Sequence, residues 1–394
     1  MRLLGALLLI LFAGCSSGLR ETRVNIDDLD AVRQERVEWN LRARLAITVA
    51  ANGEEAVLRE RVLALSERHE LRLVEDYPLP PLQLHVFVVE TSEPHKLDEL
   101  IALIRREPGV RAVQRVNLYR TQADQGSGSP ADPLAALQAF TPQEIDELHA
   151  LATGRDVTVA IIDTGLDVDH EDLQGAALAQ RDFVDMPAAA PEVHATAVAG
   201  VLLARPDNGV GIKGLAPDAN VVVLRACWQP YASQPAYCSS STLARALSEA
   251  LALDADIVNL SITGPMDPLL ALLVEQLLAR NVIVVAANRD TAEQGPFPSS
   301  LPGVIAATAR PLFAAYPGPV YAPGRDVISL LPGNRYGLHD GSSISAAHVS
   351  AIAGLFRQLN PDITAAQFDA LLRGQGIEAD GIAGLVEALT AQLP

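Results

Sequence analysis

Two hydrophobic patterns divide this chain of 394 residues. Up to about residue 120, apolar positions alternate with polar ones or recur every three to four residues, which is typical of half-buried strands and amphipathic helices. Beyond about residue 135, the strand-like stretches are continuous runs of Val, Ile, Leu and Ala, separated by helical stretches. Continuous apolar strands between helices predict an α/β fold, with a parallel sheet covered by helices on both faces.

The first pattern predicts a small α+β domain over residues 41–120. Its elements follow the order strand, helix, strand, strand, helix, strand, which is that of a ferredoxin-like module. The expected strands are RLAITVA (44–50), LRLVEDY (71–77), LQLHVFVVE (82–90) and GVRAVQRVNLY (109–119), and the helices are 54–69 and 96–106. The next segment, 121–134, is rich in Gly, Ser, Pro and Asp, which predicts an exposed, flexible linker.

The second pattern predicts a larger domain over residues 135–394. The expected strands are VTVAIID (157–163), NVVVLRA (220–226), ADIVNLSI (255–262), NVIVVAAN (281–288) and GVIAATA (303–309), with helices at 242–253 and 269–280. Ligands of such sheets bind at the carboxyl ends of the strands. Catalytic residues are therefore expected where these strands end.

Charge narrows the possible partners. The chain has 48 acidic and 30 basic residues and a formal charge of -18. Such an excess of negative charge works against binding to phosphate backbones or to anionic membrane surfaces. No nucleic-acid partner is expected.

The N-terminus has the features of an export signal. MRLLGALLLILFAGC has a basic start, an apolar run too short to span a bilayer, and small residues ahead of Cys15. It resembles the lipobox of bacterial lipoproteins, which implies a signal peptide over 1–14, lipidation of Cys15 and a tether over 15–40. Ser16 in place of aspartate implies the outer membrane, facing the periplasm. An ordinary signal peptide is the alternative.

Two further cysteines, Cys227 and Cys238, stand eleven positions apart. In an exported protein such a pair can close one loop as a disulfide, and two free thiols are the alternative. Neither cysteine is a catalytic candidate.

Three residue types needed for nucleophilic catalysis occur in a significant order. Asp163 ends the strand VTVAIID, His194 opens the small-residue stretch HATAVAG, and Ser343 lies in GSSISAAHVSAIAG, where a turn leads into a helix. Each alone has a structural explanation; a serine ahead of a helix, for example, often only caps it. The order Asp, His, Ser on an α/β sheet is that of subtilisin-type serine proteases, whereas α/β hydrolases place the serine first.

Six sequence blocks extend this similarity. In order they resemble the signature blocks of subtilisin-like serine proteases (subtilases), and they span essentially all of residues 140–394: VAIIDTGLDVDHEDL, HATAVAG, NLSITG, FPSSLPGVIA, YAPG and GSSISAAHVSA. The resemblance implies a subtilisin-like parallel sheet with helices on both faces. It also implies an exported, lipid-anchored serine endopeptidase that acts on proteins or peptides and needs no cofactor.

The resemblance also selects one serine as the nucleophile. In the family pattern, a glycine and then a serine or threonine precede the nucleophile, so Gly341 and Ser342 lead to Ser343. Ser342 is then a structural hydroxyl. Ser345 stands at a packing position, and His348 resembles a buried structural histidine on the same helix.

Further catalytic roles follow from the same resemblance. His194 is the expected general base, and Asp163 orients its ring. The side chain of Asn288, at the end of NVIVVAAN, is the expected second donor to the oxyanion, beside the backbone N–H of Ser343. The motif AANRD is one residue shorter than usual, so Arg289 occupies this position if no gap is placed.

Residues 261–264, SITG, resemble the edge strand that pairs with the extended substrate. Ser261, Ile262, Thr263 and Gly264 are therefore the expected substrate-binding residues. Thr263 replaces a glycine that is usual in the family. Its branched side chain narrows the expected specificity pocket, which predicts a preference for small residues before the scissile bond.

The small domain at 41–120 resembles the inhibitory propeptide of this family, in its order of elements and in its position. Its last strand leads directly into the linker, so self-cleavage is expected within 119–134. The domain is then an intramolecular inhibitor, and cleavage releases the catalytic domain from the lipid anchor. Alternatively, the domain stays attached as a spacer.

Two expectations remain open. Asp172 and Asn208 resemble positions that bind a structural calcium ion in many relatives, with two unremarkable loop residues as the alternative. At the level of function, the alternative is a catalytically impaired lipoprotein with the subtilase fold, which acts as a peptide-binding or scaffold protein. Changes around the triad, such as HATA for the more usual HGTH, motivate this alternative.

Overall fold

A computed structural model describes residues 43–51, 55–121, 124–125, 134, 138–184, 191–229, 236–288, 296–309, 318–375 and 383–393. The predicted signal peptide, Cys15, the tether, most of the predicted linker and Arg289 lie outside these ranges. Residues 41–394 form one compact unit, to which the following description applies. Within the described ranges, no helix is both long and apolar enough to cross a bilayer.

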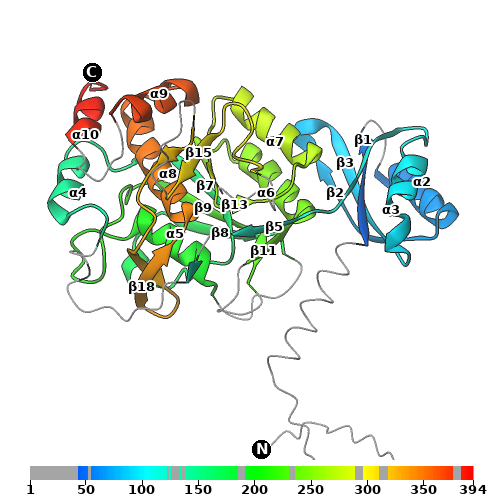
Figure 1. The fold of residues 1–394 in the computed structure, drawn as a ribbon, viewed down its shortest axis with the longest axis horizontal. Helices are drawn as coiled ribbons and strands as arrows, with labels where there is room; N and C mark the ends of the chain where they lie inside the picture. Colours follow the sequence, from blue (N-terminus) through cyan, green and yellow to red (C-terminus); the bar gives the residue numbers. More distant parts are fainter. Residues whose placement is uncertain are drawn as a thin grey trace, which may run out of the picture. The chain divides into compact units, whose positions relative to one another are not determined.

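The N-terminal region of the compact unit is α+β, as the periodicity predicts (Figure 1). Its four strands form an antiparallel sheet in the order β2-β3-β1-β4. The elements are β1 (Arg44–Ala50), α2 (Glu55–Arg68), β2 (Leu71–Leu79), β3 (Leu84–Thr91), α3 (Leu97–Ile104) and β4 (Val110–Arg115). This is the strand order of a ferredoxin-like module, with one helix in each crossover.

Both faces of this small sheet are used. Leu45, Ile47 and Val49 of β1 pack with buried residues of α2 and α3. Ala46, which points to the opposite face, belongs to a different cluster that it shares with leucines of the larger domain. The alternation along β1 therefore divides one strand between its own helices and a neighbouring domain.

The last predicted strand of this domain, 109–119, is wrong as a single element. β4 ends at Arg115, and the chain then leaves the small sheet to form β5 (Leu118–Thr121). β5 pairs with strands of the larger domain, β11 (Tyr237–Ser239) on one side and β13 (Ile262–Thr263) on the other. Residues 118–121 therefore pair with β11 and β13 and not with the small sheet. The local sequence pattern does not predict this pairing, because the partner strands are distant in the chain.

The larger domain contains the predicted parallel sheet, now with seven strands. In spatial order they are β16 (Val320–Tyr321), β15 (Ile305–Thr308), β14 (Ile283–Ala287), β12 (Ile257–Leu260), β7 (Thr158–Asp163), β9 (Asn220–Arg225) and β8 (Leu178–Asp182). The four helices that pack most closely on it are α5 (Val193–Leu203), α6 (Ser240–Ala252), α7 (Pro268–Ala279) and α8 (Ser342–Leu359).

The central strand β7 is apolar throughout because both of its faces are buried. Val159 and Ile161 face a core that includes α5 and α8, whereas Ala160 and Ile162 face a core that includes α6 and α7. All four side chains are fully buried. A strand covered on both faces excludes polar side chains until it ends, and here it ends at Asp163.

Several elements have no clear signal in the sequence. The edge strand β8 has the polar sequence LAQRD, because it pairs on one side only and its side chains are mostly exposed. Short pieces complete the fold: α4 (Pro142–His149), α9 (Ala365–Gln375), α10 (Ala383–Thr390), β6 (Asp124–Gln125), β10 (Cys227–Trp228), β17 (Val327–Leu331) and β18 (Arg335–Asp340). The antiparallel pair β17–β18 leads directly into α8.

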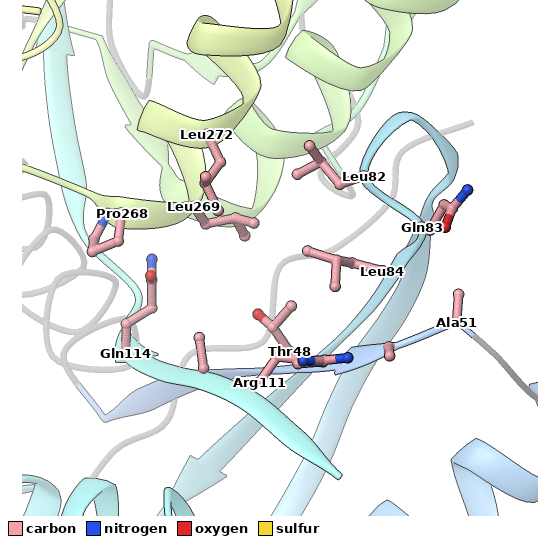
Figure 2. Close-up of a pocket in the computed structure, with 12 residues that line it drawn as sticks. Thr48, Ala51, Leu82, Gln83, Leu84, Arg111, Gln114, Pro268, Leu269 and Leu272 are labelled. Carbon is pink, nitrogen blue, oxygen red and sulfur yellow. The ribbon is translucent and has the colours of Figure 1, made fainter.

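A cavity of about 490 Å³ separates the outer part of the small sheet from the start of α7 (Figure 2). Thr48 and Leu84 line it from the sheet, and Leu269 and Leu272 line it from α7. The two domains are joined beside it by Gln114, whose side-chain amide donates to Asp267 Oδ1 over 2.6 Å. A second contact lies at β2, where the Ser241 hydroxyl donates to Glu75 Oε1 over 2.5 Å, so the domains are joined at more than one point.

Burial of His348 in the middle of α8 predicts an acid-sensitive fold. Burial lowers the pKa of His348 from 6.5 to about 4. The unfolded chain therefore takes up the proton first, and stability present above about pH 6.5 is lost as the pH falls towards 4. Between about pH 7.5 and about pH 4.5, this residue should remove roughly 2 to 3 kcal/mol from the free energy of unfolding.

Urea unfolding at the two pH values measures this loss. A Ser343→Ala background prevents self-digestion, and His348→Asn in that background should lose roughly 2 to 3 kcal/mol less than the parent. An equal loss in both proteins would mean that other groups cause the acid sensitivity.

Candidate active site

The structure brings Asp163 and His194 into direct contact, although 31 positions separate them in the chain. The Nδ1 atom of His194 lies 2.7 Å from Asp163 Oδ1 and 2.8 Å from Oδ2. Both side chains are buried. Asp163 is held at the end of β7 by the backbone N–H of Thr164, which donates to Oδ1 over 2.6 Å. Thr164 in turn accepts a hydrogen bond from Ala195 N–H over 3.0 Å, next to the histidine.

This contact sets the tautomer of His194. A carboxylate can only accept hydrogen bonds, so Nδ1 carries the proton and Nε2 is left with its lone pair. Nε2 is buried and has no hydrogen-bond partner among the described residues. A ring held in this way presents a proton acceptor to the interior of the site.

Ser343 is the second residue of α8, and its position depends on a glycine. Gly341 caps the helix with φ of 130°, a backbone conformation that residues with a Cβ atom rarely adopt. The turn therefore places Ser343 at the positive end of the helix, where backbone N–H groups lack intrahelical partners. α8 packs beside α5, whose second residue is His194 (Figure 1).

A buried polar ladder fixes the start of α8 against the sheet. Ser261 Oγ lies 2.9 Å from Asn259 Oδ1 and 3.3 Å from the carbonyl oxygen of Ser343. The side-chain amide of Asn259 donates to Ser350 Oγ over 2.9 Å, two turns further along the helix. Ser261 was predicted to bind substrate, and in the structure its hydroxyl supports the helix that carries Ser343.

The other polar residues of α8 have structural partners. Ser345 Oγ donates to Ala322 O over 2.9 Å, and the His348 ring bonds Ile344 O over 2.8 Å. Both side chains are buried. Ser342, by contrast, is partly exposed. Ser345 and His348 therefore have the structural contacts that the sequence pattern implies for them.

Asn288 follows β14 directly. Its backbone N–H donates to Ala307 O over 2.8 Å, which fixes the main chain. Its Oδ1 lies 3.1 Å from Ser299 Oγ. Ser299 therefore occupies the oxygen of the Asn288 side-chain amide, and Nδ2 is the amide's donor group. The alternative oxyanion residue, Arg289, lies outside the described residues.

The predicted substrate strand is occupied by the chain itself. Ile262 and Thr263 pair with Thr121 and Arg120 of β5 in antiparallel register. On its other side β5 pairs with β11, so it lies as the middle strand of three (Figure 1). The peptide groups of β5 are therefore bound from both sides.

Tyr119 anchors β5 from within. Its side chain is fully buried, and its ring lies 6.1 Å from that of Phe297. The ring also packs on Gly264, where an added Cβ atom would collide with the ring carbons. Gly264 was predicted as a substrate-binding residue, and its lack of a side chain makes room for an aromatic group of the bound strand.

The two calcium candidates, Asp172 and Asn208, contact each other. The Asn208 amide donates to Asp172 Oδ1, and Ile212 N–H donates to Oδ2, each over 2.9 Å. Burial raises the pKa of Asp172. Within the described ranges, no group of three or more His, Cys, Asp or Glu side chains could hold a metal ion. These contacts account for both residues as partners that join two loops.

Cys227 and Cys238 form a disulfide. The two residues lie directly opposite each other in the antiparallel pair β10–β11. The disulfide therefore braces β11, one of the two strands that bind β5.

Residues that the sequence analysis missed surround the Asp163–His194 pair. Arg225, opposite Asp163 in the sheet, is 2% exposed and forms ion pairs with Glu192 and Asp182 at 3.0 Å. Burial acts to lower the pKa of Arg225, but the bonds to Glu192 and Asp182 raise it above its ordinary value. A charged residue that ends an apolar run was the available signal.

A second histidine, His339, lies near His194. Burial, and to a lesser extent the charge that His194 can carry, lower the pKa of His339 to about 4. It is therefore neutral at physiological pH, and His194 is not opposed by a second positive ring. Its position, four residues before Ser343, carried no recognisable signal in the sequence.

Comparison with known proteins identifies this arrangement. Residues 154–376, more than half of the chain, match the model of the subtilase family. The chain belongs to the subtilase family. Subtilisin NAT of Bacillus subtilis subsp. natto is 29% identical over 290 residues, which cover 69% of this chain and 71% of that protein. The intracellular serine protease of Paenibacillus polymyxa is 29% identical over 244 residues, covering 55% and 73%.

Solved structures share the fold of this subtilase. Fervidolysin from Fervidobacterium pennivorans superposes with a TM-score of 0.67 at 20% identity, covering 89% of this chain and 61% of that one. The prenylagaramide maturation protease PagA gives a TM-score of 0.50 at 24% identity, covering 63% and 98%. The protein is thus a serine endopeptidase of the subtilase family, with protein or peptide substrates and no organic cofactor.

The geometry at Asp163 predicts the effect of removing its charge without changing its shape. Asp163→Asn can offer Nδ2 to the ring and favour the wrong tautomer of His194. We expect kcat for a peptide substrate to fall by about 10,000-fold. Asp172→Asn, which alters an equally buried carboxylate outside this site, serves as the control and should keep its kcat. A similar kcat in wild type and Asp163→Asn would contradict the geometry.

Proposed function

We propose that this subtilase is an exported, lipid-anchored endopeptidase that uses Asp163, His194 and Ser343 and cuts its own chain between β5 and β6. One observation carries the proposal: β5 is bound as the middle strand between β11 and β13, and Ser261, which directly precedes β13, contacts the backbone of Ser343. An extended chain bound on both sides is how a protease would hold its substrate.

In the proposed reaction, Ser343 Oγ attacks the peptide carbonyl carbon while His194 Nε2 takes the hydroxyl proton. The carbonyl oxygen gains negative charge, which the N-terminal N–H groups of α8 and the Asn288 amide stabilise. His194 then gives its proton to the departing amine, and Asp163 stabilises the ring while it is charged. Water repeats the sequence on the acyl group and frees Ser343.

The strand register narrows the proposed cleavage site to three bonds. Thr121, the last residue of β5, is paired with Ile262, which is adjacent to Ser261. On the far side, Asp124 of β6 is paired with Asp340, three residues before Ser343. The chain between Thr121 and Asp124 must connect these two points, and each point is within a few residues of a group that adjoins Ser343: Ser261 by contact, Asp340 in the sequence. The bonds 121–122, 122–123 and 123–124 are therefore the candidates.

Export and anchoring rest on separate observations. The Cys227–Cys238 disulfide is typical of oxidising compartments outside the cytosol. The apolar N-terminal segment that ends in Cys15 supports lipidation. Cleavage between β5 and β6 would separate the catalytic domain from that lipid, leaving it held by non-covalent contacts with the N-terminal region, such as that between Gln114 and Asp267.

Self-processing predicts a defined change in mass. Purified wild type should consist of two fragments, with the new N-terminus at residue 122, 123 or 124, whereas Ser343→Ala should remain a single chain. Intact-mass spectrometry of both proteins measures this. Ser342→Ala, which removes the neighbouring hydroxyl, is the matched control and should be processed.

Two results would contradict the proposal. Cleavage of Ser343→Ala at the same bond would assign the cut to another protease, and an intact wild type would make the N-terminal domain a permanent spacer. Immunoblots of the membrane and soluble fractions test, in the same experiment, whether the N-terminal fragment is anchored to the membrane. Cys15→Ser should move the N-terminal fragment out of the membrane fraction.

Thr263 predicts the preference of the enzyme for the residue before the scissile bond. Its side chain is fully buried in β13, beside the bound strand. We expect a peptide library to show a preference for small residues at this position. Thr263→Gly should broaden that preference towards larger side chains. A wild-type profile that favours large aromatic residues would refute the prediction.

A further inference from the structure

We propose that Glu192 and Arg225 form a buried ion pair that positions the catalytic acid and base relative to each other. The proposal rests on the roles given above to Asp163, His194 and Ser343. Glu192 and Arg225 are positioning residues, because they act through the segments that carry Asp163 and His194.

The side chain of Glu192 connects three segments of the chain. Its Oε2 atom accepts hydrogen bonds from Gly165 N–H over 2.5 Å and from Arg225 Nε over 3.0 Å. Its Oε1 atom accepts from Gln229 N–H over 2.7 Å. Gly165 belongs to the turn that follows Asp163, and Gln229 follows β10. One carboxylate thus holds the turn after the acid, the end of β9 and the entry to the substrate-binding strands.

The backbone of Glu192 adds a second connection to the same turn. Its N–H donates to Gly165 O over 3.0 Å, and its carbonyl accepts from Thr196 Oγ1 over 2.7 Å. Glu192 is the N-cap residue of α5, two positions before His194. The residue therefore binds the turn after Asp163 and the first turn of the histidine helix at once.

Arg225 supplies the matching connection through the sheet. It ends β9 directly opposite Asp163 of β7, and Ala226 N–H donates to Asp163 O over 2.9 Å. Its guanidinium also binds both oxygens of Asp182, at 3.1 and 3.0 Å. The planar fork is thereby held from two sides, and it presents Nε to Glu192 in a fixed direction.

The Glu192–Arg225 pair packs closely against the backbone of Gly165, in the turn after Asp163. Added to Gly165, a Cβ atom would lie 2.9 Å from Glu192 Oε2 and 3.3 Å from Arg225 Cδ. Burying two charges removes them from water, and such pairs often stabilise a fold no more than apolar residues of similar volume would. The pair adds direction: the two oxygens of Glu192 together accept hydrogen bonds from donors on three segments. Catalytic groups need positions correct to about 0.5 Å.

Kinetics of matched variants test the proposal. Glu192→Gln removes the charge and keeps an acceptor, and Arg225→Met keeps the volume. We expect Glu192→Gln to lower kcat by about 10- to 100-fold while KM for a peptide substrate changes by less than about twofold. Arg225→Lys, which keeps the charge without the fork, should give an intermediate kcat.

The double variant separates positioning from stability. Arg225→Met alone leaves Glu192 charged and unpaired, so its melting temperature should fall. Glu192→Gln with Arg225→Met removes both charges and should recover much of that melting temperature, while kcat stays low. Turnover is expressed per active site labelled by a fluorophosphonate, so that unfolded protein does not enter kcat.

A second ion pair, at the opposite ends of α5 and β9, serves as a matched control. Beyond the far end of α5, Arg205 pairs with Asp218, which precedes β9, at 3.3 Å. Asp218→Asn should leave kcat unchanged. If the double variant has the kcat of wild type, the positioning role is wrong, while the proposed function still stands. Failure of wild type to label at Ser343 would overturn the proposed function and this inference with it.

Discussion

The catalytic site depends on the burial of β7 on both faces. Because helices cover the sheet on each side, the first place where this strand can carry a carboxylate is its end, and Asp163 stands there. The neighbouring strands end at the same edge, which brings Arg225 opposite Asp163. Helices rich in Ala, Ser and Gly approach this edge closely, with His194 and Ser343 in their first turns. The site therefore follows from the layers of the fold more than from any local sequence.

A second constraint comes from unpaired strand edges. In the proposed function, extended substrates pair with the edges of β11 and β13, and such edges also invite unwanted pairing. In this protein β5 fills the space between them. The strand leaves the small sheet after Arg115, and Tyr119 packs against Gly264 inside the larger domain. Pairing with β11 and β13 and packing against Gly264 thus account for both the break between β4 and β5 and the burial of Tyr119.

Sequence patterns predicted the parts of the structure that depend on local periodicity. Strand β7, helix α6 and the α+β order of the N-terminal region follow from apolar runs and alternation, and the chain order of Asp163, His194 and Ser343 follows from the family pattern. The break at β5 could not be predicted, because strands more than 100 residues away decide it. Arg225 was missed because the sequence pattern of an apolar strand that ends in a charged residue is the same in two cases. The charged side chain can be exposed to water, or it can be buried in an ion pair, as Arg225 is with Glu192. The hydrogen bond from the Asn208 amide to Asp172 could not be read from the sequence, because it joins residues 36 positions apart.

The partners of Glu192 show why a polar group can serve this site better than an apolar one. Hydrophobic contact is non-directional, so it brings segments together without fixing their angles. A carboxylate has two oxygens that accept along several directions, and those of Glu192 receive donors from the turn after Asp163, from β9 and from the residue after β10. Arg225 neutralises the charge that these bonds require, and Asp182 fixes the guanidinium from the partly exposed side. Precision in the Asp163–His194 contact can therefore come from a buried charge pair even where that pair adds little to the stability of the fold.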